Sequence, residues 1–191
     1  MHREQGNCGS LANLGDGTSN TMVYSEAVRP RAQMGFGACV GFDMAEKDPR
    51  ELFPLYDKGK KAYVENAGIT PPAASYDQRG FRWASFTSWY NGFSTVLPPN
   101  SGCFGALTQS TYILATATSN HTGGVNTAFG DGSVQFISET ISWQTPGMAD
   151  YLLPANSRYS DTFAISKISG ISKYGIWGAL GTANGGESVT F

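Results

Sequence analysis

Short runs in which apolar and polar residues alternate, separated by glycine-rich turns, predict β-structure along much of this chain. The clearest runs are 125–129 and 134–137, which flank the sequence Gly130-Asp131-Gly132-Ser133. An Asp-Gly pair supplies the positive φ that a tight hairpin turn requires. The pattern therefore predicts a β-hairpin with Asp131 and Gly132 between its two strands.

A turn, a strand and two short helices are predicted elsewhere in the chain. Asp16-Gly17 indicates a turn over 15–20, and the run 21–26 that follows it is typical of a strand. Ser138 is placed to cap a short helix over 139–143, and a second short helix is predicted near 58–66. None of these elements is a long amphipathic helix.

Composition supports a fold built mainly from strands and turns. The 191 residues include 24 glycines and nine prolines, which disfavour several long helices. Aromatic residues make up 13% of the chain and charged residues 15%, so the composition does not resemble that of a disordered protein. We expect a single α+β domain over residues 1–191, mainly antiparallel β, with short helices and long loops.

Charge is distributed unevenly along the chain. The 13 Lys and Arg residues against 15 Asp and Glu give a net charge of −2, which argues against nucleic-acid binding and against an electrostatic membrane clamp. Acids and bases are concentrated in 43–65, which we expect to be a solvated surface excursion. The segment 83–130 has no Asp, Glu, Lys or Arg. It is interpreted as a sheet interior, or alternatively as a surface that packs against another subunit or a sugar.

Neither targeting signals nor the cysteines identify the cellular compartment from the sequence alone. The sequence contains no run of 18 apolar residues and starts with polar residues, so it shows neither a membrane span nor a signal peptide as written. Either the protein is cytosolic or an export segment has been lost. Cys8, Cys39 and Cys103 are too widely spaced for a CxxC metal or redox motif. They fit one disulfide with a leftover thiol, or three buried thiols.

The residues that could carry chemistry are few, and we expect no enzyme. Histidine occurs only at positions 2 and 121, and the chain has neither a GxSxG nucleophile motif nor a complete phosphate-binding loop. Oxygen ligands for calcium could come from Asp16, Asn20, Glu26 and Asp131, joined by Glu139 and Glu187. Because Asp and Asn in turns usually bind their own backbone, we expect no cofactor and treat calcium as the alternative.

Four stretches in chain order, 16–26, 93–103, 121–137 and 174–187, resemble a family of secreted pseudopilin-like proteins of unknown function that is expanded in planctomycetes. The third stretch matches that family's His-x9-Asp-Gly signature, with the residues His121, Gly123, Gly124, Asn126, Asp131 and Gly132. Family members typically begin with a prepilin-type leader and a long apolar helix, neither of which lies ahead of Met1. The chain therefore resembles the C-terminal globular head of such a protein.

The resemblance implies structural roles for the signature residues and implies no reaction. Asp131 and Gly132 form the hairpin tip, and Gly123 and Gly124 let the backbone bend before the strand. We expect His121 to be at least partly buried and to donate to a carboxylate or a carbonyl, with Glu26 as the candidate carboxylate. The first stretch supplies the remaining signature residues, Asp16, Gly17, Asn20 and Glu26. A ligand or metal site built from the same residues is the alternative.

The resemblance also suggests a disulfide. The cysteine that follows Pro98-Pro99-Asn100 is part of the similar stretch, and Cys8 lies near the start of the chain. We therefore predict a bond between Cys39 and Cys103, with Cys8 free.

Two functions remain open after this reading. The resemblance implies export to the cell surface or extracellular space and a structural role in a pilin-like filament or secretion assembly. Its partners would be further copies or other pilin-like subunits, and this chain would have no membrane contact of its own. The alternative is an extracellular module that binds a solute, a glycan or calcium, using the aromatic residues Trp83, Trp89, Tyr90 and Phe93.

Overall fold

Short strands and short helices make up the part of the protein that the structure describes. The computed structural model describes residues 10–42, 49–65, 68–72, 78–82, 84–85, 88–105, 113–144, 171–172 and 174–187. The strands are β1 (Met22–Ser25), β2 (Cys39–Gly41), β3 (Tyr56–Asp57), β4 (Ala62–Tyr63), β5 (Cys103–Gly105), β6 (Ile113–Leu114), β7 (Gly124–Phe129) and β8 (Val134–Ser138). The helices are η1 (Leu11–Asn13), α1 (Pro49–Leu52), η2 (Phe53–Leu55), α2 (Ser88–Asn91) and α3 (Gly175–Leu180). The α+β fold class with predominant β-structure is confirmed.

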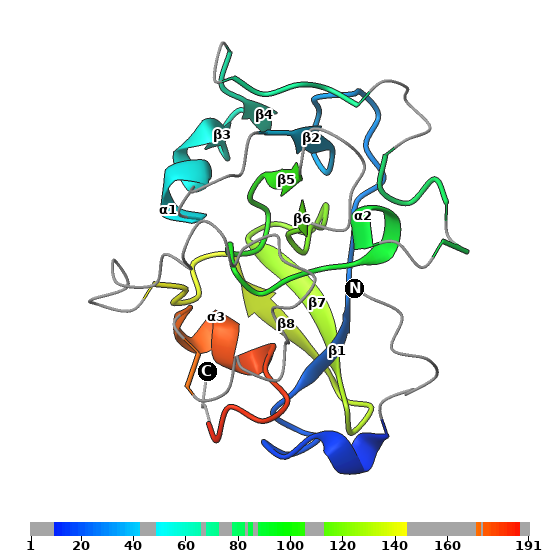
Figure 1. Cartoon of the computed structure of the whole chain (residues 1–191), viewed down its shortest axis with the longest axis vertical. Helices are drawn as coiled ribbons and strands as arrows, with labels where there is room; N and C mark the ends of the chain where they lie inside the picture. The colour runs from blue at the N-terminus through cyan, green and yellow to red at the C-terminus, as the bar shows by residue number, and fades with distance from the viewer. Residues whose placement is uncertain are drawn as a thin grey trace, which may run out of the picture.

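The predicted hairpin supplies two of the three strands of the larger sheet. β7 and β8 pair antiparallel from Gly124 opposite Ser138 to Ala128 opposite Val134, and β1 pairs antiparallel with the other side of β7. The sheet order is therefore β1-β7-β8 (Figure 1). One face of this sheet carries the buried apolar residues Met22, Val125, Phe129 and Ile137, which pack with Trp177 and Leu180 of α3. This face is the first of two main hydrophobic cores.

A second sheet, of order β2-β5-β6, lies above the first in Figure 1 and contains the disulfide. β2 and β5 pair parallel with Cys39 opposite Cys103, and these two cysteines are bonded to each other. The predicted pairing is thus confirmed, and Cys8 lies outside the described residues. A disulfide of this kind persists in oxidising compartments rather than in the cytosol.

Two cores are joined through tryptophans. The second core gathers around Val40, Leu52, Leu97 and Phe104. The indole N–H of Trp177, on α3, donates to the carbonyl of Leu97 at 2.8 Å. Trp143 packs against both cores. No helix within the described ranges is long and apolar enough to cross a membrane.

The two predicted short helices, near 58–66 and over 139–143, are not formed. Tyr56–Asp57 and Ala62–Tyr63 are the strands β3 and β4, and Lys61 adopts a positive φ of 51° in the turn between them. That conformation cannot continue a right-handed helix. At 139–143 the chain makes a turn instead, because the hydroxyl of Ser138 accepts the N–H of Thr140 two residues on.

Burial decides between the interpretations of the two unusual segments. The described residues of the uncharged stretch include completely buried side chains such as Leu97, Phe104 and Ala117, so its interpretation as an interior is confirmed. The charged stretch is less peripheral than expected. Its residues Leu52, Tyr56 and Tyr63 are buried in the second core, so 49–65 is a packed part of the fold. Its charged side chains are exposed, apart from the half-buried Arg50, Asp57 and Lys58.

Candidate functional site

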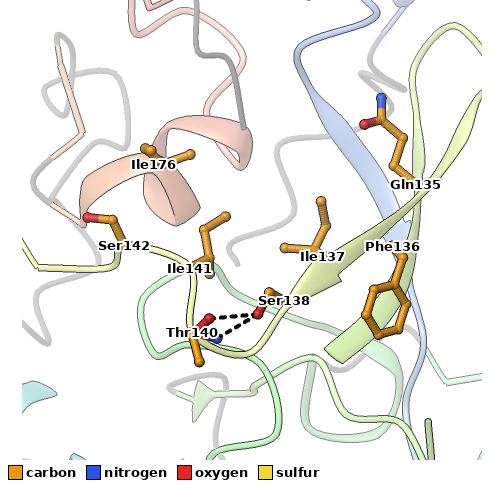
Figure 2. A pocket seen from close by; sticks show the side chains of 8 residues that line it. All are labelled: Gln135, Phe136, Ile137, Ser138, Thr140, Ile141, Ser142 and Ile176. Atoms are coloured by element: carbon orange, nitrogen blue, oxygen red, sulfur yellow. Dashed lines mark hydrogen bonds between the residues drawn. The ribbon is translucent and has the colours of Figure 1, made fainter. Parts of the chain in front are cut away.

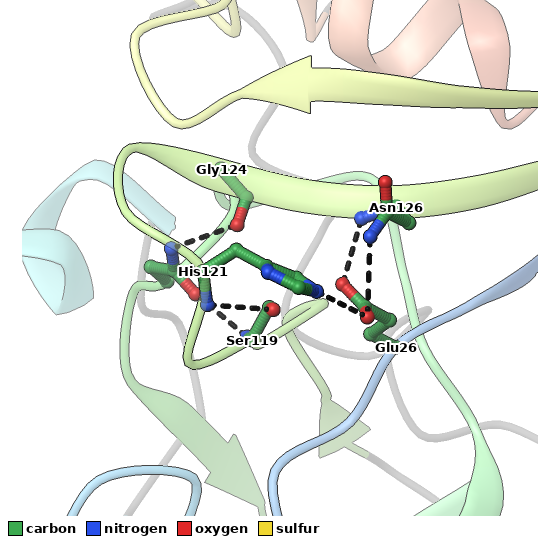
Figure 3. Close-up of polar contacts among 6 residues, drawn as sticks. Glu26, Ser119, His121, Gly124 and Asn126 are labelled. Carbon is green, nitrogen blue, oxygen red and sulfur yellow. Dashed lines mark hydrogen bonds and ion pairs between the residues drawn. The ribbon is translucent and has the colours of Figure 1, made fainter.

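Glu26 is the centre of the polar cluster that the signature residues form. It follows β1 directly, where β1 runs beside β7. One carboxylate oxygen accepts the backbone N–H of Asn126 at 2.7 Å, and the other lies 3.4 Å from the side-chain amide nitrogen of Asn126 (Figure 3). The backbone N–H of Glu26 in turn donates to the carbonyl of Asn126. Glu26 therefore binds Asn126 of β7 through both its backbone and its side chain.

His121 reaches the same carboxylate from the loop before β7. Its Nε2 lies 3.2 Å from Glu26 Oε1, so the predicted partner is confirmed. The hydroxyl of Ser119 accepts the backbone N–H of His121, which fixes the loop beneath the ring. The expected burial is wrong, because 56% of the His121 side chain is exposed. The ring lies across the end of the sheet rather than inside it.

The environment of Glu26 favours its ionised form. Partial burial raises the pKa of this carboxyl, but hydrogen bonds from the Asn126 backbone, from Ser119 and from the Asn126 side chain lower it, as does the nearby His121. The net effect is a pKa below the ordinary glutamate value. The cluster thus holds a carboxylate at neutral pH, and its hydrogen bonds go to donors of the protein itself.

Asn100 links this cluster to Glu139, which follows β8, and sequence reasoning gave it no role. It is buried and has a positive φ of 60°. Its side-chain carbonyl accepts the N–H of Ser119 at 2.9 Å, and its amide group donates to the carboxylate of Glu139 at 2.9 Å. The Nζ of Lys58 donates to the carbonyls of Pro99 and Glu139, and burial lowers the pKa of Lys58. The only sequence signal for this role was an asparagine directly after two prolines.

Asp16 joins the two ends of the resemblance in space. Its two carboxylate oxygens accept the backbone N–H groups of Gly185 and Gly186 at 2.7 and 2.8 Å. The Asn20 side chain donates to the Asp16 carbonyl, and Gly17 adopts the positive φ expected of the turn, 95°. A carboxylate that binds two successive N–H groups fixes a loop, and here the loop lies about 170 residues away in sequence.

Asp131 and Gly132 occupy the hairpin turn as predicted. The Asp131 carboxylate accepts the N–H and the hydroxyl of Ser133, which lowers its pKa. Gly132 and Gly123 have positive φ values of 86° and 82°. Gly124 is needed for space instead, since a side chain there would meet the Ile137 carbonyl and the Phe136 ring. Each signature position examined in the hairpin thus has a conformational or steric reason.

The four calcium candidates do not converge. Asp16, Glu26 and Asp131 each bind backbone N–H groups in their own part of the fold, and the side-chain amide of Asn20 faces the Asp16 carbonyl. Within the described residues, no group of three or more His, Cys, Asp or Glu could hold a metal ion. Of the two further candidates, Glu187 shares the Thr182 hydroxyl with Asp16, and Glu139 accepts the side-chain amide of Asn100. The candidate side chains therefore make structural contacts and do not form one ligand set.

The aromatic platform expected of a binding module is also not formed by the residues named for it. Trp89 and Tyr90 are 2% and 4% exposed and pack around the disulfide. Phe93 is half-buried against the first core, and Trp83 lies outside the described residues.

Among the described residues, no hydroxyl or thiol hydrogen-bonds to the His121 ring.

Comparison with known proteins gives a family without an activity. A family model described as "Protein of unknown function (DUF1559)" matches residues 3–144. This region includes β1, the disulfide, the hairpin and the Glu26 cluster. Neither a search of curated proteins nor a search of solved structures found a match.

Proposed function

Because this chain belongs to the DUF1559 family of proteins of unknown function, we propose a role from its own surface: it is a non-enzymatic structural subunit that associates with further copies or with pilin-like subunits. The observation that carries this proposal is the outer face of the β1-β7-β8 sheet. That face bears Tyr24, Val134 and Phe136, which are 74%, 65% and 51% exposed.

These three side chains form one surface because of the strand register. Tyr24 lies opposite Ala128, and Ala128 lies opposite Val134, so the three residues form a row across the sheet. Phe136 lies opposite Asn126, on the same face and two residues along β8. Exposed apolar side chains that are grouped on a regular sheet are typical of a protein contact surface.

The polar residues support a structural role over a reactive one. The carboxylates of Glu26, Asp16 and Asp131 and the amide of Asn100 are used to hold backbone groups and neighbouring side chains. A catalytic site needs a nucleophile or a base aimed at an open volume. The hydrogen bonds of this cluster point instead to the joints between β1, β7 and the loops.

The proposed setting is the cell surface or the extracellular space. The disulfide supports an oxidising compartment. The resemblance to secreted pseudopilin-like proteins supports export and a filament or secretion assembly in which this chain is the globular head. In that assembly the outer sheet face would contact the next subunit.

Sedimentation velocity of the full chain over a wide range of concentrations tests the proposal. We expect the sedimentation coefficient to rise with concentration, and Tyr24→Lys with Val134→Lys to suppress the rise. Leu11→Lys is the matched control, since Leu11 is also exposed, at 61%, but lies in η1 outside the sheet. Wild-type chain that stays monomeric at every concentration, alone and with other pilin-like subunits, would refute the proposal.

A further inference from the structure

The outer edge of β8 offers backbone groups for pairing. In an antiparallel pair, alternate residues direct their N–H and C=O groups to the partner strand. Phe129 N–H donates to the Ser133 carbonyl, and Glu139 N–H donates to the Gly123 carbonyl. These two bonds show which residues of β8 direct their backbone groups to β7. Gln135 and Ile137 therefore face β7, and Val134, Phe136 and Ser138 face away from it. Within the described residues no strand pairs with this side of β8.

The two edges of the sheet differ in their protection. Exposed edge strands are usually protected by a bulge, a proline or a charged residue, because these features prevent pairing with another chain. β1 has a register irregularity between Met22 and Tyr24 and is followed by the ionised Glu26. β8 pairs regularly along its whole length and contains no charged residue and no proline. Only β8 is shaped like a strand that accepts a partner.

Open space lies along the same strand. A groove of about 450 Å³ is lined by four consecutive residues of β8, 135–138, and on its other side by Thr140, Ile141, Ser142 and Ile176 (Figure 2). None of these side chains is ionisable, so the groove suits an uncharged segment. Figure 2 shows Phe136 pointing to the opposite side of β8 from Ile137.

We propose that β8 pairs antiparallel with β8 of a second copy of this chain, around a two-fold axis at Phe136. This inference rests on the proposed function, because it adds an edge-to-edge contact between copies to the association through the outer sheet face. Two three-stranded sheets then become one continuous sheet with the order β1-β7-β8-β8-β7-β1. Both exposed apolar faces continue across the junction, with the two Phe136 side chains adjacent.

The register follows from which residues face outward. Pairing Phe136 with itself also brings Val134 opposite Ser138, so that all three outward-facing residues of each β8 are used. Shifting the register by two residues leaves one of them without a partner inside the strand. The charge pattern agrees with this arrangement, since Glu139 then lies opposite Ser133 rather than opposite another carboxylate. A second β8 is therefore complementary to the first in both hydrogen bonding and charge.

Opposite charges at the two-fold axis test the contact directly. Phe136→Lys and Phe136→Glu each place two like charges face to face, so each variant alone should self-associate at least roughly tenfold more weakly than wild type. An equimolar mixture should regain association, because Lys then faces Glu. Leu11→Lys mixed with Leu11→Glu is the matched control and should behave as wild type throughout. Thermal melts establish that each variant is folded.

A second variant tests the backbone bonds without changing charge. Phe136→Pro removes one outward-facing N–H and no N–H that donates to β7, whereas Phe136→Ala removes only the ring. Proline should weaken association more than alanine. If wild type associates and the Lys, Glu and Pro variants associate equally well, the β8 contact is refuted and the proposed function stands. If wild type does not associate with itself, the β8 contact is refuted, and if it also binds no pilin-like subunit, the proposed function is refuted as well.

Discussion

The carboxylate of Glu26 accepts the backbone N–H of Asn126 at 2.7 Å, although the two residues are 100 positions apart in sequence. This bond joins the end of β1 to the middle of β7, and His121 and Ser119 close around the same carboxylate. The signature residues Glu26 and His121, for which a ligand or metal site was the alternative, therefore hold the signature hairpin to the first strand. The predictions below follow from that arrangement.

Glu26 should make the free energy of unfolding depend on pH in the acidic range. Its pKa is lower in the folded chain than in the unfolded chain, so its contribution is complete above about pH 4.3 and is lost as pH falls through the folded pKa. We expect Glu26→Gln to lower the free energy of unfolding by about 1 to 2 kcal/mol at pH 7. The difference from wild type should shrink steadily as pH falls below 4.3.

Chemical denaturation at a series of pH values measures this difference. Glu65→Gln is a suitable control, since Glu65 is exposed in the segment after β4 and its variant should parallel wild type at all pH values. A gap between wild type and Glu26→Gln that stays constant from pH 7 to pH 3 would contradict the role given to the ionised carboxylate.

Asp16 should matter more than Asp131, although both are turn aspartates. Asp16 binds Gly185 and Gly186 from the other end of the chain, whereas Asp131 binds Ser133 within its own turn. Asp16→Ala should lower the free energy of unfolding by about 2 kcal/mol and expose 182–187 to limited proteolysis. Asp131→Ala should have a smaller effect and leave that segment protected. Equal protease sensitivity of the two variants would oppose this assignment.

Two glycines of the hairpin, Gly124 and Gly132, should resist substitution by alanine for different reasons. Gly132 has a positive φ and no atom within 4 Å of an added Cβ, so Gly132→Ala should cost about 1 kcal/mol from backbone strain alone. Gly124 has an ordinary φ, but an added Cβ there meets the Ile137 carbonyl of β8. Gly124→Ala should cost about 2 to 3 kcal/mol. Thermal melts in which Gly132→Ala is the more damaging change would reverse this reasoning.

The disulfide should contribute strongly to stability. It is buried and joins residues 64 positions apart, for which the chain-entropy model gives about 4 kcal/mol. The double variant Cys39→Ala, Cys103→Ala should therefore melt well below wild type. A nonreduced peptide digest should contain the Cys39–Cys103 pair and a free Cys8. A digest in which Cys8 is bridged would contradict the predicted free thiol.

The sequence predicted those elements whose information is local. The hairpin follows from Asp131-Gly132 between alternating runs, and the strand after Asp16-Gly17 follows from the same kind of signal. β2 and β5 have only three residues each, which is too short for periodicity to be visible. The helix expected near 58–66 rested on charge composition, which says nothing about the positive φ of Lys61.

Long-range contacts explain what was missed at the site. The Glu26–His121 contact was predicted because both residues belong to the resemblance, but the exposure of the His121 ring depends on where the 119–122 loop crosses the sheet. Asn100 lies in the second stretch of the resemblance, which gave it no role, and Glu139 lies outside the four stretches, so their bond is visible only when the loops are folded together. The contact between Asp16 and Gly185 is of the same kind.

Residue-resolved amide exchange of the full chain, compared between dilute and concentrated samples, tests the central claim that this sheet is an association surface. The N–H groups of Gln135 and Ile137 face β7 and should be protected in both samples. The N–H groups of Val134 and Phe136 face outward, so they should exchange quickly when dilute and become protected at high concentration. If the exchange of Phe136 is unchanged while the chain remains monomeric, the account of this protein as a self-associating structural subunit is contradicted.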